Sequence, residues 1–106
     1  MTTLYLSAPN DKSQQGSAFY KDFYTILQSG AGPDYALYST LVGQGNPGSR
    51  VVVFDRGRQL QAEGVVSHLV PKPSNRVSRY DVHIQNLVAV QYNRPPNVNR
   101  CGVQVL

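Results

Sequence analysis

Residues 51–70 read VVVFDRGRQLQAEGVVSHLV, and they carry the clearest signal of how the chain folds. Val51–Phe54 is apolar at successive positions, which predicts a strand that is covered on both faces in the middle of a sheet. Asp55–Arg58 contains a glycine and predicts a turn. Along Gln59–Val70 the pattern alternates, so a second strand follows. Its apolar face is expected to hold Leu60, Ala62, Gly64, Val66, His68 and Val70. Together the segments predict a β-hairpin.

Further strands are expected on both sides of this hairpin. They are rich in β-branched and aromatic residues or alternate apolar with polar positions. Proline and glycine-rich connections separate them. The expected strands are Thr2–Ser7, a strand that begins at Tyr35, Arg79–Val90 and Cys101–Leu106.

One segment follows a helical period instead. Apolar residues recur at helical spacing within Ser17–Gln28, with Ser13 or Ser17 as the N-cap and Gly30 with Gly32–Pro33 as the stop. We therefore expect an α+β fold of about six strands and one main helix. So many strands in so short a chain favour a curled or barrel-like sheet, which hides its edges.

Composition limits the function without naming it. The chain has 106 residues, enough for one domain over 1–106. Its net charge is +4, and most of its basic residues are arginine, which suits recognition of phosphates and base edges. The excess permits a polyanionic partner but does not require one. Cys101 is the only cysteine, which excludes an intramolecular disulfide framework and fits a reducing compartment.

The N-terminal residues and the apolar runs bear on location. Leu4–Leu6 is interrupted at once by Ser7–Pro9, which is unlike a secretory signal peptide. The longest aliphatic or aromatic runs have four residues and are far too short to cross a bilayer. We therefore expect a cytoplasmic protein without a membrane partner.

The order of elements, together with four short motifs, resembles the PUA-like superfamily, and within it the EVE and ASCH type of domain. Leu4–Asn10 is similar to the opening strand and Ser-Glu-Pro signature of EVE domains, with Ala8 in the acidic position. Pro47–Phe54 is similar to the family's Pro-Gly-Asp turn and barrel strand, with Ser49 in place of the aspartate. Ala62–Val66 and Arg79–Val82 resemble the strands that follow.

This resemblance implies a small β-barrel with a helix over one opening. It also implies binding of nucleic acids, often modified bases, or of small ligands in that opening. Ala8 cannot supply the acidic contact of the family. The function expected is therefore a non-catalytic binding module for single-stranded nucleic acid or a nucleotide-like small ligand.

Proteins commonly bind unpaired bases with arginine and aromatic side chains, because arginine contacts to phosphate supply affinity and the aromatic rings stack on the bases. The arginines are expected to converge on a tyrosine-lined opening. The expected ligand-binding residues are Ser7, Asn10, Tyr35, Tyr38, Arg56, Arg58, Arg76, Arg79 and Tyr80.

The sequence gives only weak indications of catalytic or metal-binding residues. Asp81 and His83 share a strand face, but one histidine is not a site, and an exposed polar face explains the pair. His68 is expected to be partly buried at a strand end. No catalytic residue, cofactor or metal site is therefore expected. An alternative function is an interaction protein that works through a dimer or partner surface, for which the seven tyrosines of the chain would be suitable.

Overall fold

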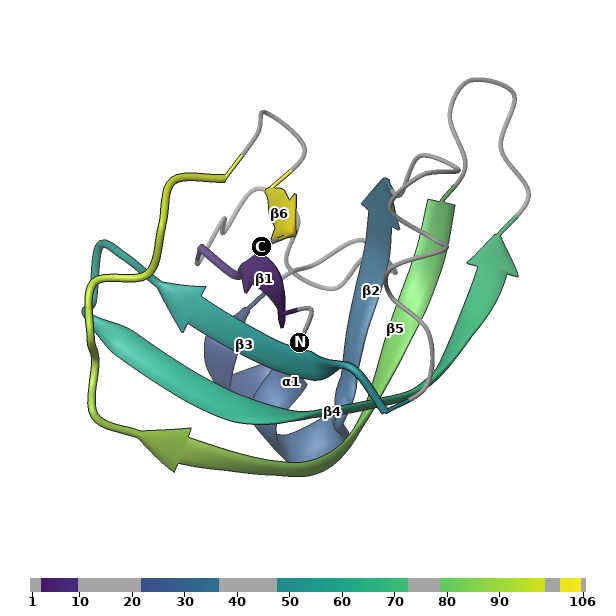
Figure 1. The fold of residues 1–106 in the computed structure, drawn as a ribbon, viewed down its shortest axis with the longest axis horizontal. Helices are drawn as coiled ribbons and strands as arrows, with labels where there is room; N and C mark the ends of the chain where they lie inside the picture. The colour runs from purple at the N-terminus through teal and green to yellow at the C-terminus, as the bar shows by residue number, and fades with distance from the viewer. Residues whose placement is uncertain (1–2, 10–21, 37–47, 73–78, 99–101, 106) are drawn as a thin grey trace.

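The structure is a computed structural model that describes residues 3–9, 22–36, 48–72, 79–98 and 102–105. In this part of the chain six strands form one curled sheet, and one helix packs against one of its faces (Figure 1). The elements are β1 (Thr3–Ser7), α1 (Phe23–Ser29), β2 (Ala31–Ala36), β3 (Arg50–Asp55), β4 (Leu60–Lys72), β5 (Arg79–Val90) and β6 (Val103–Val105).

The strand order is β2-β5-β4-β3-β1-β6. β1 and β3 are parallel and every other neighbouring pair is antiparallel, so the sheet is mixed. β2 and β6 end the sheet, which makes the fold a half-barrel rather than a closed one. The expected α+β class, with a small curled sheet, is confirmed.

β3 is covered on both faces, as the run Val51–Phe54 predicts. Val51 and Val53 belong to the core between the sheet and α1, together with Phe23 and Ile26. Val52 and Phe54 are equally buried but point to the other side of the sheet, which we call the outer face. The outer face is therefore covered too, although the helix is not on that side.

The helix α1 is capped at both ends. Asp22 is the N-cap, and its side chain accepts a hydrogen bond from the Thr25 N–H at 3.2 Å. Gly30 ends the helix in the left-handed region at φ 72°, which confirms the predicted stop. The helix thus begins at Phe23, later than the expected Ser17, and Asp22 caps it in place of Ser13 or Ser17, which lie outside the described residues.

β2 begins earlier than expected. It starts at Ala31, directly after the helix, whereas the sequence pattern placed the strand from Tyr35. Pro33, expected in the helix stop, lies inside β2, because β2 is an edge strand, where a proline costs no ladder hydrogen bond on the open side. The part of the expected strand beyond Ala36 is outside the described residues.

Two irregularities bend the long β4–β5 hairpin. The first lies between Glu63 and Val65, where Gly64 faces the bulged pair Asn86 and Leu87. Asn86 has a positive φ of 56°. The second lies between Val66 and His68 and leaves Ser67 as the extra residue. Each bulge changes which face the following side chains occupy.

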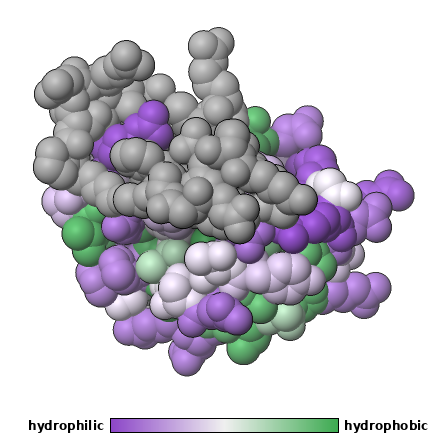
Figure 2. All heavy atoms as spheres, turned by 180° about the vertical axis from the view of Figure 1, so that it is seen from behind, coloured by the Kyte–Doolittle hydropathy of each residue, from purple (hydrophilic) through white to green (hydrophobic). Residues whose placement is uncertain are grey.

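The expected apolar face of β4 is therefore wrong at its end. After the bulge at Ser67, Leu69 packs against the core, whereas His68 and Val70 are exposed. The view from behind in Figure 2 shows hydrophobic and hydrophilic residues mixed over the described surface. Among the described residues, no helix is long and apolar enough to cross a membrane.

Candidate functional site

Among the expected arginines that the structure describes, Arg79 lies far along the hairpin from Arg56 and Arg58. Arg56 and Arg58 lie in the turn between β3 and β4, next to the end of the hairpin where Gln61 pairs with Val90. Arg79 lies at the opposite end, where it pairs with Lys72. The strand between the two ends spans about 36 Å along its length, at about 3.3 Å per residue. The remaining expected residues Asn10, Tyr38 and Arg76 lie outside the described part of the chain.

Arg58 holds the helix to the turn. Its Nε donates to Asp55, and its Nη2 donates to Asp22 Oδ1 at 2.9 Å. Its guanidinium also lies 5.3 Å from the centre of the Tyr24 ring. The hydrogen bond to Asp55 raises the pKa of Arg58. Burial raises the pKa of Asp22, but the bonds from Arg58 and Thr25 outweigh it and hold that pKa below its ordinary value.

Arg56 holds a different segment. Its Nη2 donates to the carbonyl oxygens of Pro95 and Pro96 at 2.8 and 2.9 Å. Its guanidinium lies 5.3 Å from the centre of the Phe54 ring. Arg56 therefore holds Pro95 and Pro96 while its guanidinium covers the ring of the buried Phe54.

The expected aromatic residues are largely internal. Tyr35 has no exposed surface, its hydroxyl donates to the Ser7 carbonyl oxygen at 2.8 Å, and burial raises its pKa. The contact joins β2 to β1 across the half-barrel. Tyr80 is half-buried and packs against the core. In this arrangement Tyr35 offers no surface on which a ligand could stack.

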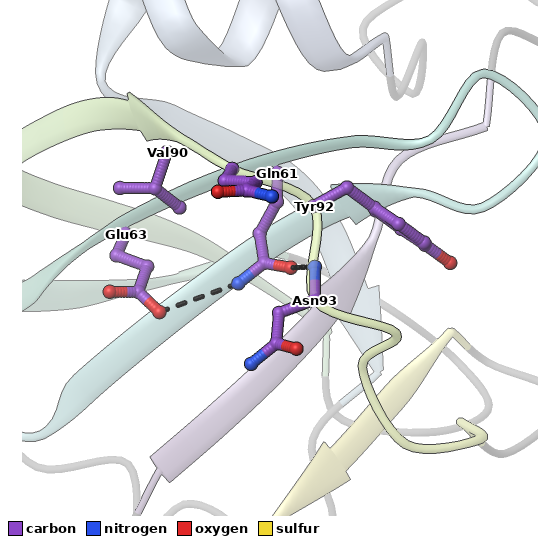
Figure 3. A pocket seen from close by; sticks show the side chains of 6 residues that line it. Gln61, Glu63, Val90, Tyr92 and Asn93 are labelled. Carbon is purple, nitrogen blue, oxygen red and sulfur yellow. Dashed lines mark hydrogen bonds between the residues drawn. The ribbon is translucent and has the colours of Figure 1, made fainter.

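A groove lies instead on the outer face, between β4 and residues 91–98. It consists of two adjoining cavities of about 370 and 190 Å³, which share Gln61, Glu63 and Asn93. The larger one is shown in Figure 3. The groove is lined by Tyr5, Arg50, Val52, Gln61, Glu63, Val90, Gln91, Tyr92, Asn93, Arg94, Pro95 and Pro96.

Gln61 builds the floor of this groove. Its side chain is buried, and its Oε1 accepts a hydrogen bond from the Asn93 N–H at 2.9 Å. Its Nε2 donates to Glu63 Oε1 at 3.4 Å (Figure 3). Arg50 also donates to Glu63 Oε1. Both bonds to the carboxylate end on Oε1, so Oε2 can accept a further donor.

The walls carry groups that a ligand could use. Tyr92 is half-buried, and the Asn93 carboxamide and the Arg94 guanidinium are exposed. No described residue hydrogen-bonds to the Tyr92 hydroxyl or the Asn93 carboxamide. Arg50 and Arg94 line the smaller cavity, so positive charge borders the groove. The groove therefore combines an aromatic ring, amide and carboxylate groups, and two arginines.

Apart from their place beside a strand connection, the residues of this groove carry no mark in the sequence that predicts it. The prolines of Asn93–Asn97 indicate only a connection that cannot pair in a sheet interior. Tyr92 and Arg94 beside that proline-rich connection were the available signal. Gln61 and Glu63 alternate with the core residue Ala62, which places them on the outer face of β4.

Comparison of the chain with family models, with curated proteins and with solved structures gave no match. In the described part of the chain, no group of three or more histidine, cysteine, aspartate or glutamate side chains is placed to hold a metal ion.

Proposed function

We propose that the protein is a PUA-like, non-catalytic binding module, and that an unpaired nucleobase or a nucleotide-like small ligand occupies the outer-face groove. The observation that supports this proposal is the combination of Tyr92, Asn93 and Glu63 around one cavity of about 370 Å³. Cavities that hold small ligands are commonly about 300 Å³ or larger and present a few convergent polar groups.

Each wall of the groove has a role in this proposal. The Tyr92 ring stacks on the base, which is tolerant of sequence because every base has a π-face. The Asn93 carboxamide and Glu63 Oε2 bond to the polar edge of the base. A carboxylate only accepts hydrogen bonds, and the single N–H on the polar edge of uracil or thymine lies between two carbonyl oxygens that repel it. Glu63 therefore favours bases with an exocyclic amino group. Arg50 and Arg94 contact the phosphate.

A titration of the protein with AMP, CMP and UMP tests the base selectivity. We expect amide resonances of residues 91–94 to shift with AMP or CMP more than with UMP. Tyr92→Ala should abolish the shifts, whereas Tyr24→Ala should leave them, because Tyr24 is an exposed tyrosine on α1, on the other side of the sheet. Shifts that persist in Tyr92→Ala, or that fall outside the groove, would contradict the proposal.

The phosphate contacts are tested with a single-stranded oligonucleotide at several salt concentrations. Each phosphate contact on a single strand contributes about 0.7 to the slope of log affinity against log salt. We expect Arg94→Ala to lower that slope by about this amount. Arg79→Ala is the matched control, because Arg79 lies at the far end of the hairpin, and it should leave the slope unchanged. An equal effect of both variants would place the charge contribution elsewhere.

A second candidate function is assembly with another copy of this chain along β5. β2 pairs with β5 only as far as His83, and in the described part of the chain no strand pairs with Gln85–Val90 on that side. Gln85–Val90 contains neither charge nor proline, and Val88 is 58 % exposed. Such an edge is suited to β-pairing between chains. The wild type should then be a dimer by light scattering and Val88→Lys a monomer, whereas a monomeric wild type rejects the assembly.

A further inference from the structure

The two histidines of the chain face each other across neighbouring strands. His68 of β4 pairs with His83 of β5, although fifteen positions separate them in the sequence. Their rings stack with centroids 4.4 Å apart and planes at 6°. The bulge at Ser67 causes this pairing, because it turns His68 away from the core and onto the face of His83.

A chain of hydrogen bonds holds one of the rings. Ser67 Oγ lies 3.0 Å from His68 Nδ1, and Gln85 Nε2 donates to Ser67 Oγ at 3.3 Å. A hydroxyl oxygen has two lone pairs, so it can accept from Gln85 and from a protonated Nδ1 at the same time. In that tautomer His68 Nε2 has a free lone pair. A hydrogen bond of this kind to the other ring nitrogen is what orients histidines that ligate metals.

We propose that His68 and His83 bind one divalent late first-row transition-metal ion between them. Imidazole nitrogen suits Cu²⁺, Ni²⁺ and Zn²⁺, and the general order of affinities places Cu²⁺ highest. Two nitrogens bound to one such ion lie about 3 Å apart, since each metal–nitrogen bond is about 2.0–2.1 Å. The Ser67 bond holds the His68 ring, whereas no described residue hydrogen-bonds to the His83 ring, so His83 can turn from face to edge and bring a nitrogen towards His68 Nε2.

The site has two protein ligands, and water molecules complete the coordination. This limits the affinity to that of a two-imidazole chelate, because the described residues offer no group of three ligands. The bound ion joins β4 to β5 beside the bulge and so stabilises the folded state.

Calorimetric titration of the untagged 106-residue chain with Zn²⁺ tests the proposal in a Cys101→Ser background, which removes its only thiol. We expect one ion per chain. His68→Gln and His83→Gln should each bind as weakly as the double variant, because a chelate needs both rings. Ser67→Ala should weaken binding by about tenfold while retaining the same stoichiometry, as loss of an orienting hydrogen bond does.

Titration with Cu²⁺ supplies a second readout. The paramagnetic ion should broaden the ring resonances of both histidines at the same ion concentration. Melting temperatures without metal identify any variant that fails to fold. Two independent weak sites, single variants that each lose only half of the binding, or wild-type binding equal to that of the double variant would overturn the proposal.

Discussion

Gly64→Ala tests whether the bend of the hairpin depends on the close approach of two backbones. A Cβ atom at Gly64 would lie 2.6 Å from the Gln85 carbonyl oxygen and 2.7 Å from Ile84 Cγ2. It would also lie 3.1 Å from Leu87 Cα. Close carbon–oxygen contacts in proteins are about 3.3 Å or longer, so β5 would have to move by about 0.7 Å.

The expected cost follows from the fact that backbone atoms surround this position. Insertion of one carbon into a packed interior costs about 1–3 kcal/mol. We expect the upper end, about 3 kcal/mol, because the Gln85 carbonyl belongs to a paired strand and cannot turn aside as a side chain can. In a domain of this size, 3 kcal/mol lowers the melting temperature by about 12–24 °C.

Gly57→Ala is the matched control, since it makes the same change in the neighbouring turn. The nearest atom to its Cβ would be Asp55 Oδ1 at 3.5 Å, an ordinary contact. We expect its stability to stay within about 1 kcal/mol of the wild type, because alanine reduces the entropy of the unfolded chain. Urea unfolding and thermal melting measure both variants. If Gly64→Ala were as stable as Gly57→Ala, the close approach of the strands at Gly64 would be refuted.

Three further outcomes follow from the contacts around α1 and on the outer face. Phe54→Ala should lower the free energy of unfolding, measured by chemical denaturation, by about 3–5 kcal/mol, because it leaves a cavity between β3 and the segment that Arg56 holds. A change below about 1 kcal/mol, which corresponds to a melting shift of a few degrees, would show that Phe54 is not a core residue. Arg58→Ala should lower the free energy of unfolding by about 1–3 kcal/mol, because it removes the hydrogen bonds to the two largely buried carboxylates of Asp22 and Asp55. Equal stability of Arg58→Ala and the wild type would show that these bonds contribute nothing. The depressed pKa of Asp22 adds stability that is present above its unfolded pKa of about 4 and is lost as the pH falls through its lower folded value. The stability of Asp22→Asn should therefore depend less on pH below about 4 than that of the wild type. An unchanged pH dependence would exclude Asp22 as the cause.

Local patterns predicted the elements of the fold well where one physical cause dominates. The run Val51–Phe54 is apolar on both faces because β3 lies between a core and a covered outer face. Gly30 ends the helix because only a left-handed residue can turn the chain there. The start of β2 was missed because a proline is compatible with an edge strand, and a sequence does not reveal which strands are edges.

The arginines show why a site is harder to predict than a fold. Their number and type indicate phosphate recognition, but each side chain is placed by long-range pairing. Arg58 meets Asp22 across 36 positions, and Arg56 meets Pro95 across 39. A turn arginine that holds two segments together has the same local sequence as one that faces a ligand. Arg50 and Arg94, which line the groove, lack any local mark that separates them from Arg56 and Arg58.

The pairing of His68 with His83 depends on the bulge at a single residue of β4. Strict alternation along β4 puts His68 on the core face with Val66, where it could not meet a ring on the solvent side of β5. One extra residue, Ser67, reverses the face of every position that follows in the strand. That same residue then supplies the hydroxyl that lies against His68 Nδ1. The bulge therefore both pairs the histidines and orients one of them, and no periodic pattern in the sequence marks it. Deletion of Ser67 should keep His68 opposite His83, because His68 would then follow Val66 directly and simple alternation places it on the outer face. Cu²⁺ broadening at both histidines should persist while Zn²⁺ affinity falls as in Ser67→Ala, and loss of the broadening would contradict this account.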